Sequence, residues 1–153
     1  MEKYDSREDT LKHIENVQEK INFFIDLLKE RANIHDASKL LDPEKETFDI
    51  VTPRLRGMTF GSEEYNQSLK EMSTALSHHY QNNSHHPEHY ENGIDGMDLV
   101  DLVEMFMDWC AATERHANGD LYKSIEINQK KHNISDQLTN IFKNTFNRYI
   151  NKK

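Results

Sequence analysis

Histidine is the residue type of this chain whose number and spacing point to chemistry. Nine of the 153 residues are histidines, and five of these lie between His78 and His89, in the segment HHYQNNSHHPEH. Histidine is the commonest metal ligand in proteins and a frequent proton carrier. Core packing gives no reason for such a cluster of imidazole rings, so the segment predicts a metal or proton-transfer site. A solvated polar loop is the alternative interpretation.

A histidine–aspartate pair upstream offers a second set of ligand atoms. His35 supplies an imidazole nitrogen, and Asp36 supplies a carboxylate whose two oxygens can bridge two ions. Lys39 follows His35 by one helical turn, so its ammonium group could reach a phosphate bound beside an ion. Such pairs also cap helices, and this structural role is the competing interpretation.

Two further positions complete the candidate ligands. His13 lies at the edge of an apolar helical stripe, where a histidine bonded to a backbone carbonyl is as plausible as a ligand. Asp101, Glu104 and Asp108 share one narrow stripe of a segment that is otherwise apolar almost all round. Because buried carboxylates need a cation or hydrogen bonds, we expect a metal ion as the partner of Asp108. A salt bridge to Arg115 is the alternative.

Helices must hold these residues in place. Apolar periodicity and capping residues predict helices over residues 7–31, 43–52, 62–80, 97–117, 121–131 and 135–149. The polar stretch 81–96 contains Pro87 and two glycines and predicts an irregular loop. Glycine and proline are scarce elsewhere, which disfavours a many-stranded β fold. We therefore expect an all-α fold, with residues 1–153 forming a single compact helical domain of about six helices.

Charge and composition exclude several classes of partner. Lys and Arg total 19 and Asp and Glu total 27, which gives a net charge of −8. An acidic chain without a basic cluster argues against duplex nucleic acid and anionic membranes as partners. We expect neither a membrane span nor a signal peptide at MEKYDSRED. The single cysteine, Cys110, fits a reducing, cytoplasmic setting. The amphipathic last helix allows a homo-oligomer.

The order of the candidate residues resembles the HD-domain superfamily of metal-dependent phosphohydrolases. The segment HDASK at 35–39 looks like the superfamily's central His-Asp-x-Gly/Ser-Lys motif. HHPE at 85–88, followed by Gly93 and Gly96, is similar to a segment of the binuclear branch. The resemblance implies an all-helical fold that binds one or two divalent ions. A Gly-Tyr-Pro sequence does not follow the histidine turn, so cyclic-dinucleotide hydrolysis is not implied.

A closer resemblance, over most of the chain, is to a small family of unknown function found in phages and bacteria. The matching motifs are HDxSK at 35–39, NSHHPE at 83–88 and EMxxDW at 104–109. This resemblance implies a bacterial or phage-infected host cell as the setting. It supplies no substrate.

The superfamily resemblance implies two sets of metal ligands. The first site would consist of His13, His35, Asp36 and Asp108. The second would share Asp36 and would add His79 together with His85 or His86. His78 is an alternative to His79, and Asp101 is an alternative to Asp108.

These ligands lead to the hypothesis of metal-assisted phosphoester hydrolysis. Mixed nitrogen and oxygen ligands suit one or two ions of Mn, Fe, Co, Ni or Zn. Asp36 would hold the metal that activates water, and Lys39 would neutralise phosphate charge. Glu88, Glu104 or His89 would carry a proton to the leaving oxygen. Because the chain is acidic, a small phosphorylated substrate such as a nucleotide is a better fit than long DNA.

Three other functions fit the same residues. The chain could be a non-catalytic helical module with a structural metal, which binds a partner protein or sequesters a nucleotide. It could be a metal-free helical protein with solvated histidines. It could also be a di-iron oxygenase, since ligands alone do not determine the reaction.

Overall fold

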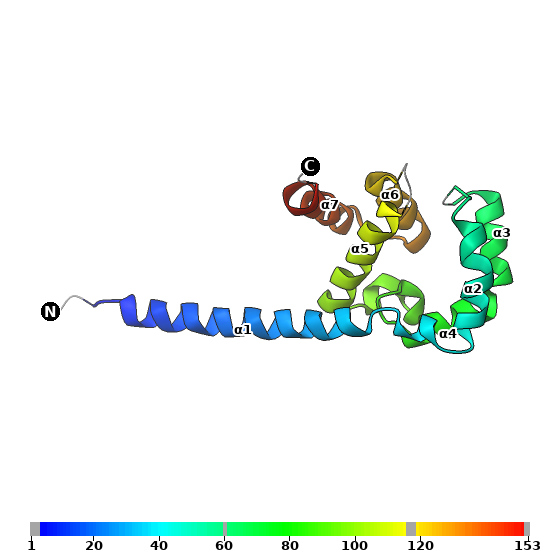
Figure 1. Cartoon of the computed structure of the whole chain (residues 1–153). Coiled ribbons are helices and arrows are strands. Elements are labelled where there is room, and N and C mark those ends of the chain that lie inside the picture. Colours follow the sequence, from blue (N-terminus) through cyan, green and yellow to red (C-terminus); the bar gives the residue numbers. More distant parts are fainter. Residues whose placement is uncertain (1–3, 60, 116–118, 152–153) are drawn as a thin grey trace. The chain divides into compact units, whose positions relative to one another are not determined.

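A computed structural model describes residues 4–59, 61–115 and 119–151 of the chain. Every regular element among these residues is a helix, which confirms the all-α prediction (Figure 1). The backbone contacts divide the chain into two compact units, residues 1–35 and 36–153, and each is described by itself. The single domain over residues 1–153 stays a prediction. None of the described helices is both long enough and apolar enough to span a bilayer.

The first unit consists mainly of one long helix, α1 (Arg7–Ile34). The helix extends three residues beyond the predicted end at Arg31. None of these residues is a glycine or a proline, so nothing in the sequence breaks the helix before Ile34. Its apolar stripe has the predicted helical spacing, yet none of its residues is buried. Leu11 and Ile21 are both more than half exposed.

The second unit contains the remaining helices and several short turns. Its α-helices are α2 (Glu44–Leu55), α3 (Glu63–Glu71), α4 (Ser73–Asn82), α5 (Leu99–Glu114), α6 (Leu121–His132) and α7 (Asp136–Thr145). The 3₁₀ turns are η1 (Ala37–Leu40), η2 (Pro87–His89) and η3 (Gly93–Gly96), and the π-helical turn η4 (Phe146–Ile150) follows α7. The predicted loop 81–96 therefore contains two short helical turns.

The described residues form seven α-helices instead of about six, because the predicted helix 62–80 is two helices. The chain bends at Met72, which is 1% exposed and whose amide bonds the carbonyl of Leu69. We attribute the bend to the burial of the Met72 side chain, which stabilises two shorter helices more than the one continuous helix that periodicity predicted. The helix expected to end before Pro53 continues to Leu55, since a proline near the last turn removes only one backbone hydrogen bond. The predicted helix end at Ala117 lies outside the described residues.

The main hydrophobic core lies between α5, α6 and α7. Phe106 and Phe142 stack there with their ring centroids 4.9 Å apart, and Trp109 meets Phe142 edge to face. Ile125 of α6 is 1% exposed beside them. The side chain of Ser135 accepts a hydrogen bond from the amide of Leu138 and so caps α7. This core gives α5 a rigid support for the carboxylates on its other face.

Candidate metal centre

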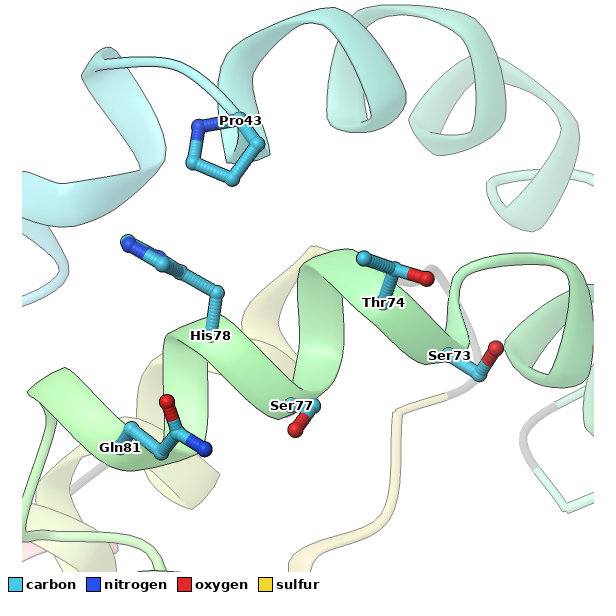
Figure 2. Close-up of a pocket in the computed structure, with 6 residues that line it drawn as sticks. All are labelled: Pro43, Ser73, Thr74, Ser77, His78 and Gln81. Atoms are coloured by element: carbon cyan, nitrogen blue, oxygen red, sulfur yellow. The ribbon is translucent and has the colours of Figure 1, made fainter.

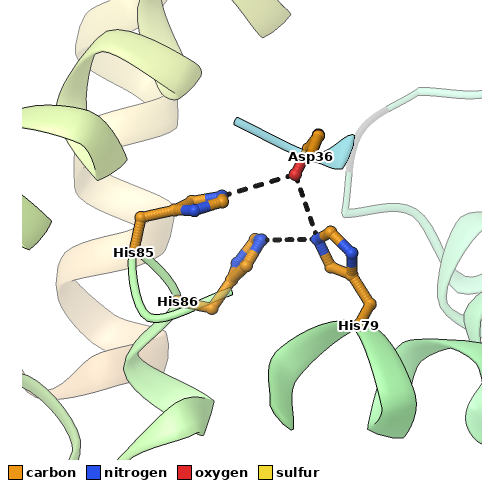
Figure 3. Close-up of side chains that lie close together, drawn as sticks. All are labelled: Asp36, His79, His85 and His86. Atoms are coloured by element: carbon orange, nitrogen blue, oxygen red, sulfur yellow. Dashed lines mark hydrogen bonds and ion pairs between the residues drawn. The ribbon is translucent and has the colours of Figure 1, made fainter. Parts of the chain in front are cut away.

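Four side chains from three segments of the second unit meet in one cluster (Figure 3). Asp36, His79, His85 and His86 each offer a ligand atom, and these atoms all lie within 4.8 Å of one another. Asp36 precedes η1, His79 belongs to the last turn of α4, and the other two histidines lie in the loop before η2. The HDxSK and HHPE motifs, far apart in sequence, are thus brought together. We call these four residues the ligand cluster.

The distances within the ligand cluster suit shared coordination of a cation. The Oδ1 atom of Asp36 lies 3.2 Å from Nε2 of His79 and 3.6 Å from Nε2 of His85. The Nε2 atoms of His79 and His86 are 3.0 Å apart. His79 and His85 are each 1% exposed, whereas the side chain of Asp36 is 18% exposed. The cluster is therefore buried on the histidine side and reaches solvent at Asp36.

Burial keeps one of these imidazoles neutral. Burial, followed by the neighbouring rings of His85 and His79, lowers the pKa of His86 to about 2. A neutral imidazole has a lone pair, which is the form that a metal ion binds. His86 is thus in its ligand form throughout the physiological pH range.

The backbone of Asp36 adopts a conformation that residues other than glycine seldom take. Its φ of 55° lies in the left-handed region, which asparagine and aspartate tolerate better than other residues with a side chain. In this conformation Asp36 is the N-cap residue of η1, which begins at the next residue. Lys39 of η1 donates to Oδ2 of Asp36 at 2.5 Å, and its ammonium also lies 5.2 Å from the ring centre of Phe48. The predicted phosphate-binding lysine therefore lies beside the cluster.

A buried glutamate, Glu44, stands behind His79. Glu44 is 0% exposed, and its Oε2 accepts from Nδ1 of His79 at 2.9 Å and from the hydroxyl of Ser38 at 3.0 Å. Its Oε1 accepts from Nδ1 of His78 at 2.7 Å. Burial raises the pKa of Glu44, but the hydrogen bonds from His78, Ser38 and His79 outweigh it and lower the pKa overall.

Sequence reasoning missed Glu44. A glutamate in the first turn of a helix is ordinarily explained by the helix dipole, so its type and position gave no signal of burial. The spacing of Ser38 and His79 relative to Glu44 becomes informative only once α2 and α4 pack together.

His78 lies outside the ligand cluster. It lines a surface pocket of about 450 Å³ together with Pro43, Ser73, Thr74, Ser77 and Gln81 (Figure 2). None of these lining residues belongs to the ligand cluster. Of the two alternatives left open by the sequence, His79 is therefore the one whose nitrogen faces Asp36.

The predicted carboxylate stripe of α5 meets the histidine segment. Oε1 of Glu104 lies 3.0 Å from Nδ1 of His85. A carboxylate oxygen of Asp108 lies within 4.8 Å of one of Asp36. Both residues are partly buried, so the stripe predicted from the helical wheel forms one side of the site.

Asp101 has a different partner set from the other two. It is 1% exposed and accepts hydrogen bonds from the hydroxyls of Ser84 at 2.7 Å and Tyr90 at 2.5 Å. It also forms a capping box with Asp98 at the start of α5. Asp101 thereby fixes the loop that carries His85 and His86 to the first turn of α5.

Glu88, a predicted proton carrier, contacts residues of α6. Its carboxylate accepts from Lys131 at 2.7 Å and lies 4.0 Å from Nε2 of His132. Burial raises the pKa of Glu88, but the hydrogen bond and charge of Lys131 outweigh it and lower the pKa overall. A carboxylate that stays ionised and paired fastens the histidine turn to α6, and its proton-transfer role stays a prediction.

His13 and His35 belong to the first unit. His13 is exposed on α1, and His35 directly precedes Asp36 in the chain. Their predicted part in metal binding stays a prediction.

Comparison with known proteins gives a family and no function. No curated protein and no solved structure matches the chain. The resemblance to the HD-domain superfamily stays a prediction. A family of unknown function (DUF5662) matches residues 2–148, which include all the motifs discussed above. The chain belongs to this family.

Proposed function

We propose that this protein binds a divalent transition metal at the ligand cluster and uses it to hydrolyse a small phosphoester, with a nucleotide as the expected class. The observation that carries the proposal is the convergence of Asp36, His79, His85 and His86 within 4.8 Å. Two of these side chains are almost fully buried, where polar groups require strong partners.

The donor set fits such a metal. Three imidazole nitrogens and one carboxylate match the preferences of Mn²⁺, Fe²⁺, Co²⁺, Ni²⁺ and Zn²⁺ better than those of Mg²⁺ or Ca²⁺. The exposed edge at Asp36 supports an open site, because a purely structural metal is usually enclosed by its ligands. Asp108 of α5, a carboxylate oxygen of which lies within 4.8 Å of one of Asp36, is a candidate ligand for a second ion.

The reaction needs no oxidant, reductant or second substrate. The oxygen of water bonds to phosphorus, the phosphorus–oxygen bond to the leaving group breaks, and the leaving oxygen takes its electron pair and a proton. A bound divalent ion supplies a nucleophile at neutral pH and polarises the phosphoryl oxygens. In this proposal, Lys39 would move from Asp36 to a phosphate oxygen, and the Glu104 carboxylate would take up a proton and return it to the leaving oxygen, while His85 stays a ligand.

Asp36→Asn is the variant that tests the proposal. Asparagine tolerates the left-handed backbone at this position and removes the negative charge, so the fold is expected to persist. We expect the wild type, reconstituted with Mn²⁺, Fe²⁺, Co²⁺, Ni²⁺ or Zn²⁺, to hold one or two ions per chain and to hydrolyse members of a nucleotide and phosphoester panel. Asp36→Asn should lose at least one ion and at least about 100-fold of the hydrolysis rate. Metal content by mass spectrometry and phosphate release are the measurements.

Asp49→Asn is the matched control, since Asp49 is exposed and pairs only with Lys45 in the described residues. It should retain both metal and turnover. Wild-type metal content in Asp36→Asn would contradict the proposed site. Stoichiometric metal with no turnover on any phosphoester would favour the non-catalytic module instead.

A further inference from the structure

We infer that Glu44 is a positioning residue, which holds His79 in the tautomer that binds the ion through Nε2. The inference rests on the proposed metal site and adds a residue to it that no motif indicated. Glu44 contacts the ligand cluster at Nδ1 of His79, so we expect its effect to reach the ion through the imidazole ring of that histidine.

The hydrogen-bond donors and acceptors around Asn83 determine the tautomer of His79. The side-chain amide of Asn83 has two hydrogens, and it lies 2.8 Å from the carbonyl of His79 and 2.8 Å from the hydroxyl of Ser38. Those two acceptors use both hydrogens. The amide of Asn83 also lies 3.0 Å from Nδ1 of His79 but has no hydrogen left for it.

Ser38 and His79 then both donate to Glu44. The hydroxyl of Ser38 accepts from Asn83, and its own hydrogen can reach Oε2 of Glu44 at 3.0 Å or Nδ1 of His79 at 3.2 Å; the carboxylate is the nearer and the charged acceptor, so we assign the hydrogen to Glu44. A carboxylate can only accept, so Nδ1 of His79, 2.9 Å from the same oxygen, carries a proton. In a neutral ring this leaves the lone pair on Nε2.

The lone pair on Nε2 of His79 is directed at the other members of the ligand cluster. The Nε2 atom lies 3.2 Å from Oδ1 of Asp36 and 3.0 Å from Nε2 of His86. Nε2 of His79 and Oδ1 of Asp36 thus direct their lone pairs at the same space, as a bound cation requires. A carboxylate hydrogen-bonded to the other nitrogen of a metal-bound histidine raises the basicity of that ligand. Glu44, Ser38 and Asn83 therefore form one hydrogen-bonded support for His79, in which Ser38 comes from the HDxSK motif and Asn83 from the NSHHPE motif.

Glu44→Gln tests the inference. Glutamine has one acceptor oxygen in place of two, so it cannot accept from His78 on one side and from His79 and Ser38 on the other. We expect Zn²⁺ and Co²⁺ to bind 10–100-fold more weakly, and the visible absorption of the Co²⁺ form to change because the ring of His79 is reoriented. Chelator competition and the Co²⁺ spectrum are the measurements.

Two controls separate positioning from general damage. Glu46→Gln changes an exposed glutamate of the same helix and should leave both readouts unchanged. His78→Ala removes the other imidazole from Glu44 while leaving His79 bound to it, and should change the Zn²⁺ affinity by less than about threefold.

The metal-binding results for the wild type and Glu44→Gln separate the proposed metal site from the positioning role of Glu44. If the wild type binds no metal, the proposed function fails and this inference falls with it. If the wild type binds metal and Glu44→Gln binds it equally, with the same Co²⁺ spectrum, only the positioning role is overturned. If Glu44→Gln does not fold, Ser38→Ala replaces it. That variant should lower Zn²⁺ affinity by about tenfold, and an unchanged affinity would overturn the role.

Discussion

Single side chains in this protein take their chemical character from burial. His86 is held neutral by its surroundings, and Cys110 follows the same physics with a different result. Cys110 is 8% exposed in the core of α5, α6 and α7. Burial, followed by the charge of Glu114, raises the pKa of Cys110 to about 11. A thiol is nucleophilic only as the thiolate, so this cysteine is a core residue and an unreactive one.

We predict that Cys110 resists thiol reagents in the folded protein. Because its pKa is raised, only about a thousandth of the thiol is ionised at pH 8, and this fraction grows as the pH approaches 11. Labelling with a chromogenic disulfide reagent at pH 8 should be slow in buffer and should reach one thiol per chain in guanidinium chloride. Fast labelling without denaturant would contradict the buried position.

At the scale of elements, the turn between α4 and α5 determines where the histidines lie. Asp101 at the start of α5 binds Ser84 and Tyr90, and η3 packs against Tyr90. A Cβ atom added to Gly96 would lie 2.4 Å from Oδ1 of Asn92 and 2.8 Å from Cβ of Tyr90. The backbone of η3 thus fits against Tyr90 only because residue 96 has no side chain.

Gly96→Ala should therefore destabilise the fold. We expect a loss of about 1–3 kcal/mol of unfolding free energy, the usual cost of overpacking, measured by guanidinium chloride denaturation. Gly57→Ala is the matched control, because a Cβ there meets nothing closer than 3.8 Å. It should change stability by less than about 0.5 kcal/mol. Equal effects of the two substitutions would contradict the close packing at η3.

The sequence predicted the helices better than their ends and breaks. Apolar periodicity identified α1, α5, α6 and α7, because each has a continuous stripe that a 3.6-residue period reveals. The bend at Met72 and the passage of α2 through Pro53 depend on packing between distant segments, which periodicity does not contain. For the same reason, His79 and Asp36 could be predicted as candidates from their residue types, but the contact of Glu44 in α2 with His79 in α4 could not.

At the scale of the whole second unit, the ligand cluster closes a long stretch of chain. Asp36 and His86 lie 50 positions apart in the sequence, with α2, α3 and α4 between them. An ion bound by both ends would favour the folded state over the unfolded chain, which has no preformed site. Stability is thus expected to depend on metal concentration.

We predict that metal raises the melting temperature of the protein. At a free metal concentration 100-fold above Kd, linkage gives about 2.7 kcal/mol of stabilisation. For a chain of this length, that corresponds to a rise of about 5–11 °C relative to the protein in excess chelator. Thermal unfolding followed by circular dichroism measures it, and the rise should be much smaller in Asp36→Asn. An equal rise in Asp36→Asn would place the bound metal at other residues.

The left-handed backbone at Asp36 also constrains how the family can evolve. Asparagine and glycine are the two replacements that this conformation accepts with least strain, and each is one nucleotide change away from an aspartate codon. If the proposed metal site exists, a lineage could therefore lose it in one mutation without disturbing its helices. Relatives that carry asparagine or glycine at this position are expected to be the ones that kept the fold and lost the ion.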